Sequence, residues 1–110
     1  MRLVRHPFFE RDLIGIVDHI VDVTDSNTAA AAKGLDEIDA MISTIAKNPI
    51  SGVRLKGSLD GWLVRHGGSG RRLTIVFKPD VAAGVIDLAL VAFGGRDWVK
   101  LASVRKQFSE

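Results

Sequence analysis

The sequence contains neither cysteine nor tyrosine among its 110 residues. The lack of cysteine excludes disulfide bonds and cysteine-ligated zinc, and it fits a reducing compartment. No apolar run reaches the roughly 18–20 residues of a membrane-spanning helix, because Gly84 and Asp87 interrupt the longest one, residues 81–95. Charged residues and His6 also break up the N-terminal segment, so we expect no signal peptide and a cytoplasmic protein that does not contact membranes.

The rest of the composition is that of an ordinary globular protein. Hydrophobic residues make up 46% and charged residues 25%, which is enough apolar material for one core, and the length predicts a single domain over residues 1–110. The net charge is only +2, but residues 1–60 hold seven Lys and Arg against nine Asp and Glu, and residues 61–110 hold eight against four. This basic half indicates an anionic partner such as nucleic acid, or simply a solvated surface of that charge.

Hydrophobic spacing predicts two helices in the first half of the chain, after a short extended segment at residues 2–6 that ends before Pro7. The first helix opens at Pro7, and the second covers residues 28–47 and ends at Asn48-Pro49. Residues 24–27 are polar and offer caps, so the two helices form a hairpin. The apolar stripes are Phe9, Leu13, Ile16, Val17 and Ile20 in the first helix, and Ala31, Leu35, Ile38, Ile42 and Ile45 in the second.

The second half changes to the alternation of β-strands after a loop at residues 48–61. Asp97 is placed to cap a last helix from Trp98 to about Lys106. Helices grouped before consecutive strands indicate an α+β domain with the order β-α-α-β-β-β and a short C-terminal helix. The predicted strands are residues 62–66, 71–78 and 85–93, the last of which is almost wholly apolar and is expected to be central.

Few motifs in the chain carry recognisable chemistry. The histidines His6, His19 and His66 lack the spacing of metal ligands, so we expect neither a metal nor another cofactor, and we expect His19 to be a partly buried structural residue. No serine-hydrolase motif is present. The run at residues 67–70, Gly-Gly-Ser-Gly, resembles a phosphate-binding loop, but it lies between two predicted strands and fits a hairpin turn better.

A set of basic residues follows the predicted strands and the last helix. Guanidinium groups bind phosphate bidentately and stay charged, and a cluster of them stabilises the charge of a phosphodiester under attack. The same residues could instead only solubilise an exposed face of the sheet. The set comprises Arg65, Arg71, Arg72, Arg96, Lys100, Arg105 and Lys106.

Several local motifs, taken in this order, resemble those of one family. The first helix opens at Pro7 with Asp12-Leu13, and the second is rich in alanine and stops at Asn48-Pro49. The remaining motifs are Gly52…Leu55-Lys56-Gly57, Trp62-Leu63-Val64-Arg65, Ser69-Gly70-Arg71-Arg72-Leu73 and Val91-Ala92-Phe93-Gly94-Gly95-Arg96. Over nearly its whole length the chain therefore resembles the RelE/ParE superfamily, the growth-arresting toxins of bacterial type II toxin–antitoxin systems.

The resemblance implies a helical hairpin packed on an antiparallel sheet of about four strands, with the first strand at an edge. It also implies a cognate antitoxin protein that masks the active surface in a hetero-oligomer. RelE-like members cleave mRNA in the ribosomal A site, and by motif position their catalytic basic residues correspond to Arg65, Arg72 and Arg96. Further contacts to RNA are expected from Arg54, Lys56, His66, Arg71, Trp98 and Lys100.

The sequence departs from this pattern where an RNase would often have a tyrosine, because the residue six positions after Arg96 is Ala102. His66 could activate the ribose 2′-hydroxyl instead, although strand alternation points it away from Arg65. Trp98 could stack a base or belong to the core. Three functions stay open: a ribosome-dependent mRNA interferase, a ParE-like inhibitor that binds DNA gyrase without catalysis, and an inactive module that only binds antitoxin.

Overall fold

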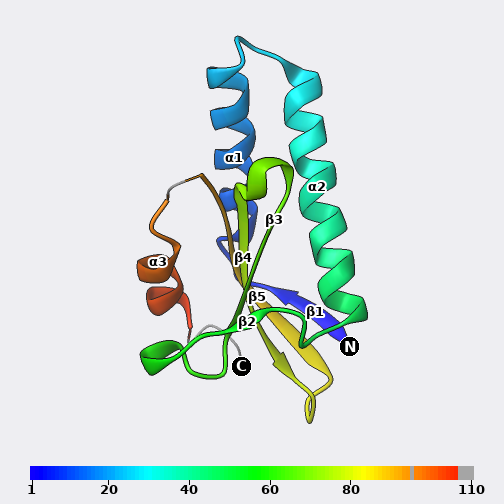
Figure 1. Ribbon diagram of the computed structural model, residues 1–110, viewed down its shortest axis with the longest axis vertical. Coiled ribbons are helices and arrows are strands. Elements are labelled where there is room, and N and C mark those ends of the chain that lie inside the picture. The colour runs from blue at the N-terminus through cyan, green and yellow to red at the C-terminus, as the bar shows by residue number, and fades with distance from the viewer. Residues whose placement is uncertain (95, 107–110) are drawn as a thin grey trace.

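Three α-helices and a five-stranded sheet form the part of the chain that the computed structural model describes, residues 1–94 and 96–106 (Figure 1). The α+β class, the helical hairpin and the short last helix are confirmed. None of the described helices has the length and apolar character needed to cross a lipid bilayer. In chain order the elements are β1 (Arg2–Arg5), α1 (Phe9–Val23), α2 (Thr28–Lys47), β2 (Val53–Arg54), β3 (Leu63–Gly67), β4 (Leu73–Asp80), β5 (Val85–Phe93) and α3 (Trp98–Arg105), with short 3-10 turns η1 (Gly57–Leu59) and η2 (Ser69–Arg71).

The strands lie in the order β1-β5-β4-β3-β2, so β1 is at an edge as expected and β5 is inside the sheet. The sheet is mixed, because β1 runs parallel to β5 while the other neighbours are antiparallel. It also gains β2 from the segment that we predicted to be a loop. The hydrophobic pattern of a four-residue edge strand carries no information on strand direction, which depends on the path of the chain through the helical hairpin.

The helical hairpin covers one face of the sheet with the stripes predicted from the sequence. In α1 the residues Phe9, Ile16 and Ile20 are buried, and Leu13 and Val17 pack against them at the margin. The connection between the helices is capped as predicted, because the Asn27 side chain accepts a hydrogen bond from the backbone N–H of Ala30. Alternate residues of β4, namely Leu73, Ile75 and Phe77, pack from the sheet into the core between it and the hairpin.

The opposite face of the sheet carries a second apolar cluster, covered by α3 and the η1 turn (Figure 1). Val64 and Val76 come from neighbouring strands and pair in register. From α3, Ala102 is buried and Trp98 and Leu101 are partly buried against the cluster. The Asp97 side chain caps α3 as predicted, by accepting a hydrogen bond from the Lys100 N–H. The molecule therefore has three layers, with the hairpin and α3 on opposite sides of the sheet.

A buried ion pair between α1 and α3 lies at a β-bulge in β5 and binds the backbone there. Val76 pairs with Leu90 and Phe77 with Leu88, which leaves Ala89 without a partner in β4. Arg105 donates to the Ala89 carbonyl over 3.0 Å and makes a bidentate pair with Asp12, at 2.6 and 3.0 Å. Arg105 is only 6% exposed, so our assignment of this residue to the basic surface set was wrong.

Gly52 lies where the chain passes over the sheet, and we predict that Gly52→Ala destabilises the fold. An added Cβ would lie 2.9 Å from the carbonyl oxygen of Val64 and 3.1 Å from the ring of Phe77. Because this overlap involves backbone, we expect a loss of about 1–3 kcal/mol in the free energy of unfolding, measured with urea. Gly15→Ala is the control, since a Cβ there meets nothing within 4 Å and a helix interior favours alanine by up to about 1 kcal/mol. Equal stabilities of the two variants would contradict this reading.

Candidate nucleic-acid interface

His66 lies near the end of β3, on the face of the sheet that α3 covers. It pairs in register with Thr74 of β4, and its Nδ1 lies 2.9 Å from the Thr74 hydroxyl. Its ring meets that of Trp98 edge-on, with centroids 6.0 Å apart. Both His66 and Trp98 are partly exposed. Trp98 is therefore a member of the apolar cluster and also lies beside a histidine, so its core role is confirmed and its stacking of a base stays a prediction.

Arg65 points to the opposite face, as strand alternation predicts. Its Nη1 donates to the Ser51 carbonyl over 3.2 Å, and its backbone pairs with Ile75 of the hairpin-side core. Nevertheless, Arg65 and His66 both line a shallow cavity of about 300 Å³ at the margin of β3 beside α2. The structure thus brings these two residues to one cavity from different faces of the strand.

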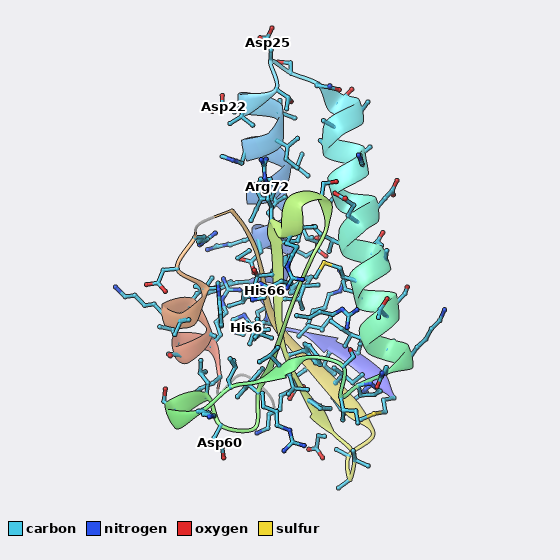
Figure 2. The ribbon with its side chains drawn as sticks, in the orientation of Figure 1. His6, Asp22, Asp25, Asp60, His66 and Arg72 are labelled. Carbon is cyan, nitrogen blue, oxygen red and sulfur yellow. The ribbon has the colours of Figure 1, made fainter. Side chains whose placement is uncertain are left out.

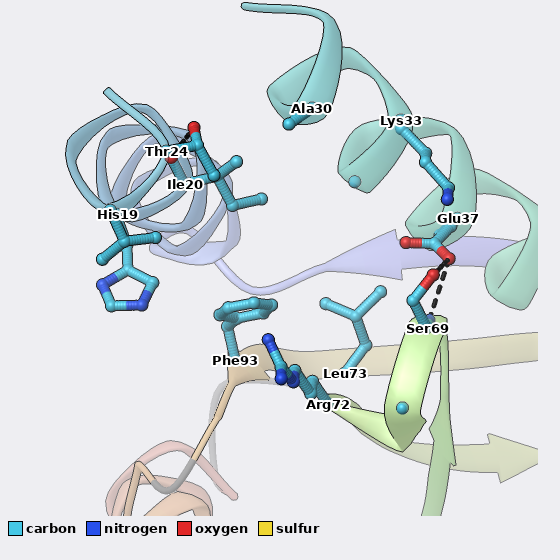
Figure 3. A pocket seen from close by; sticks show the side chains of 13 residues that line it. His19, Ile20, Thr24, Ala30, Lys33, Glu37, Ser69, Arg72, Leu73 and Phe93 are labelled. Carbon is cyan, nitrogen blue, oxygen red and sulfur yellow. Dashed lines mark hydrogen bonds between the residues drawn. The ribbon is translucent and has the colours of Figure 1, made fainter. Parts of the chain in front are cut away.

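Arg72 lies on the hairpin side, although alternation in the predicted strand 71–78 would place it on the same face as Thr74. We expected it inside a strand, but it has helical backbone angles (φ −84°, ψ −12°) and precedes the first residue of β4. The β alternation therefore does not reach it. The side chain lines a cleft of about 400 Å³ between the helical hairpin and the β3–β4 turn (Figure 3).

Three further cations emerge at the end of the sheet where Arg72 lies. The Gly94 N–H donates to the Arg72 carbonyl over 2.9 Å, so the end of β5 lies beside the η2 turn. Arg71 is exposed in that turn, and Arg96 and Lys100 are exposed just after β5 and in the first turn of α3. Figure 2 shows Arg72 towards the hairpin, Asp60 at the far end of the molecule and His66 between them.

Arg54 and Lys56 lie at the other end of β3, away from this group. Arg54 pairs with Leu63 at the start of the strand, and it lines a separate cavity of about 330 Å³ next to Trp62. Lys56 is exposed and precedes the η1 turn. The nine predicted site residues therefore divide into seven near the end of β3, which are spread over both faces of the sheet, and two outlying cations.

The cations of the site are largely free of neutralising partners. Over residues 1–94 and 96–106 the ion pairs are Arg5–Glu10 and Arg105–Asp12, and neither includes a predicted site residue. Exposed charges without ion pairs are available to bind phosphate. Within the same ranges, no three His, Cys, Asp or Glu side chains are grouped closely enough to hold a metal ion.

Sequence reasoning missed several residues of these sites. His19 is exposed and packs its ring against Phe93, with centroids 5.3 Å apart, so our prediction of a partly buried structural role was wrong. Thr74 falls within the predicted strand 71–78 and Glu37 within the predicted helix 28–47, and neither was predicted as a site residue. No local signal marks them, because their partners lie in strands and turns that are distant in sequence.

The pKa of His6 is lowered from its ordinary value of 6.5. Partial burial disfavours the charged imidazolium, and Arg105 repels it, while Asp12 partly offsets both effects. Its Nδ1 accepts a hydrogen bond from the Phe8 N–H over 3.0 Å, which fits a neutral ring.

This shift predicts that the protein loses stability as the pH falls through about 6.5, the ordinary value. In that range the unfolded chain protonates the imidazole and the folded chain does not, so protonation favours unfolding. The contribution of His6 to the free energy of unfolding is fully present above pH 6.5 and is lost as the pH falls towards the lower pKa of the folded state. Between pH 7.5 and pH 5.5 the free energy of unfolding, measured with urea, should fall less for His6→Gln than for the wild type. Identical losses would assign the pH dependence to other groups.

No family model matches the sequence, and no curated protein matches it at a significant level.

Proposed function

We propose that this chain is the toxin of a type II toxin–antitoxin system and that it cleaves mRNA on the ribosome. The observation that supports this most is the group formed by His66, Thr74 and Trp98, at the sheet end where Arg96 and Lys100 emerge. A histidine can deprotonate a ribose hydroxyl, a large aromatic ring can stack a base, and cations without ion pairs can bind a phosphate.

In this proposal His66 is the general base. When its Nδ1 donates to the Thr74 hydroxyl, Nε2 is the unprotonated nitrogen and can take the proton of a ribose 2′-hydroxyl. The 2′-oxygen then bonds to the adjacent phosphorus, and the bond from phosphorus to the 5′-oxygen of the next nucleotide breaks. The leaving oxygen takes a proton from solvent, and the products are a 2′,3′-cyclic phosphate and a 5′-hydroxyl.

The neighbouring residues supply binding and charge. Trp98 stacks the base at the cleaved position, and Arg96 and Lys100 bind the phosphates on either side. Arg65 precedes His66 in β3 and lines the same cavity. Release of its side chain from the Ser51 carbonyl would let it reach the phosphate that is cleaved. A cognate antitoxin would act by covering this sheet end.

A ParE-like inhibitor of DNA gyrase is the second candidate. It is favoured because Arg65, Arg72 and Arg96 do not share one surface, and because the chain has no tyrosine. Such an inhibitor needs a binding surface but no catalytic group. A third candidate is an inactive superfamily member that binds only antitoxin.

Induction in a bacterial host without antitoxin separates the three functions. The proposal expects incorporation of labelled methionine to stop before that of labelled thymidine, with codon-phased cuts in translated mRNA by primer extension. An earlier stop of thymidine incorporation, together with inhibited supercoiling by purified gyrase, would replace the RNase with the inhibitor. Normal growth at full expression would leave only the antitoxin-binding module.

A further inference from the structure

A second site lies on the hairpin side of the sheet, on the face opposite to His66. It is the cleft of about 400 Å³ between the last turns of α1, the first turns of α2 and the β3–β4 turn (Figure 3). This volume is within the range of pockets that hold small organic ligands. None of the functions proposed above uses it.

The floor and one side of the cleft are apolar and aromatic. Phe93 and Leu73 come from the sheet, and Ile20 comes from α1. The His19 ring packs at a tilt against the Phe93 ring, and both rings line the cleft. An aromatic face that is partly exposed in an apolar cleft is a platform for a planar ring, because stacking removes apolar area from water on both partners.

The remaining wall is polar and partly fixed in place. Glu37 of α2 accepts two hydrogen bonds at one carboxylate oxygen, Oε2, from the Ser69 N–H at 2.9 Å and from its hydroxyl at 2.7 Å. These bonds join α2 to the β3–β4 turn and hold the carboxylate at the cleft wall, as Figure 3 shows. The second oxygen, Oε1, is left to accept hydrogen bonds from a ligand.

Two cations complete the lining. Arg72 projects from the turn beside Phe93, and Lys33 projects from α2 beside Glu37 (Figure 3). Both residues are exposed, and neither belongs to an ion pair within the described part of the chain. The cleft thus combines an aromatic platform, a positioned carboxylate and unneutralised cations within the span of one small molecule.

We propose that this cleft binds a purine nucleotide, with its base on Phe93, its N–H edge at Glu37 and its phosphate at Arg72 and Lys33. The aromatic platform accounts for the base, and the cations account for the phosphate. Guanine is the preferred base, because its imino and amino groups are adjacent donors that can both reach the remaining oxygen, Oε1, of Glu37. The nucleotide is either free in solution or an unpaired residue of an RNA strand.

The test is a titration of isotope-labelled full-length protein, followed by backbone amide shifts in NMR. The probes are guanosine monophosphate, inosine monophosphate, guanosine and a short single-stranded RNA containing guanine. We expect shifts at Ser69 and Phe93 with the monophosphates. Guanosine, which lacks the phosphate, should bind about tenfold more weakly, and inosine monophosphate, which lacks the amino group, should also bind more weakly than the guanine nucleotide.

Arg72→Gln should weaken guanosine monophosphate binding by about tenfold or more without changing the fold. Arg54→Gln is the matched control, since it removes an exposed cation that lines a different cavity, and its affinity should stay at the wild-type value. Tighter binding of the RNA than of the monophosphate, measured from the shifts of Ser69 and Phe93, would assign the cleft to a strand, and equal binding would assign it to a free nucleotide. The absence of shifts at the cleft residues with every probe, or equal weakening by the two variants, would overturn the proposal.

This inference does not depend on the proposed toxin function. Nucleotide binding is measured on purified protein, and growth arrest is measured in cells. Nucleotide binding together with normal growth would support the cleft site and contradict the toxin function. Growth arrest without nucleotide binding would support the toxin function and contradict the cleft site.

Discussion

Asp12→Ala is expected to lower the free energy of unfolding by about 3–5 kcal/mol, the largest stability effect that we predict for a single substitution. Asp12 is 3% exposed and Arg105 6% exposed. Removal of the carboxylate leaves a buried guanidinium with no counter-charge, and the desolvation cost of that charge is no longer offset. For a domain of this size such a loss is a large part of the total stability.

The position of the pair in the sheet adds to this effect. Strand β1 ends at Arg5, opposite Leu88, so β5 has no strand neighbour on that side beyond this point. Asp12 accepts the Val91 N–H over 3.2 Å, and Arg105 donates to the Ala89 carbonyl. The two side chains replace the missing strand and also connect α1 to α3.

Urea unfolding measures this prediction, and a double-mutant cycle isolates the coupling. Asp12→Ala combined with Arg105→Ala should cost clearly less than the sum of the two single changes. The double variant should still be less stable than the wild type, because the Val91 N–H and the Ala89 carbonyl lose their partners. Glu10→Ala is the control: it breaks the exposed pair with Arg5 and should cost less than about 1 kcal/mol. Additive single effects would show that Asp12 and Arg105 act separately.

His66→Gln is expected to abolish growth arrest and to lower the rate of mRNA cleavage by about 10²–10⁴-fold. Glutamine has a similar size and can still bond to Thr74, but it cannot accept the ribose proton. Colony counts after induction and primer extension on ribosome-bound message give the two readouts. Thermal unfolding of the purified variant shows whether the fold is retained.

His6→Gln is the control for the same exchange at a histidine outside the proposed site, and at neutral pH it should leave growth arrest intact. Thr74→Val tests the positioning of His66: it should lower cleavage less than His66→Gln and change the dependence of cleavage on pH, because the hydrogen bond between His66 Nδ1 and the Thr74 hydroxyl is lost. Full growth arrest by His66→Gln would exclude the histidine as the base.

The fold was largely predictable from the sequence because its signals are local. The second helix was predicted with the observed ends, Thr28 and Lys47, since Asn27 caps its start and Asn48-Pro49 ends its apolar stripe. Strand β5 was likewise predicted at Val85–Phe93, because an apolar run between turns needs a covered position in a sheet. The parallel pairing of β1 and the two-residue strand β2 were not predicted, because their patterns are too short to indicate direction or pairing.

The candidate site was less predictable, since it depends on which side chains meet. Alternation along β3 correctly separated Arg65 from His66, because both lie within the regular strand. The same rule failed for Arg72, which lies in a turn with helical backbone angles. Arg105 has the sequence context of a surface arginine, and only its contact with Asp12, 93 positions away, shows that it is structural.

By itself, the sequence determined the α+β class, the helical hairpin, the central strand and the basic character of the second half, because hydrophobic period, caps and charge are properties of neighbouring residues. Only the tertiary structure decided how the arginines divide among the two faces of the sheet, the cleft beside Phe93 and the buried pair with Asp12. The bulge at Ala89 interrupts the alternation of β5, so that Ala89 and Leu90 both lie in the cluster under α3, and the turn at Arg72 keeps that residue out of the alternation of β4.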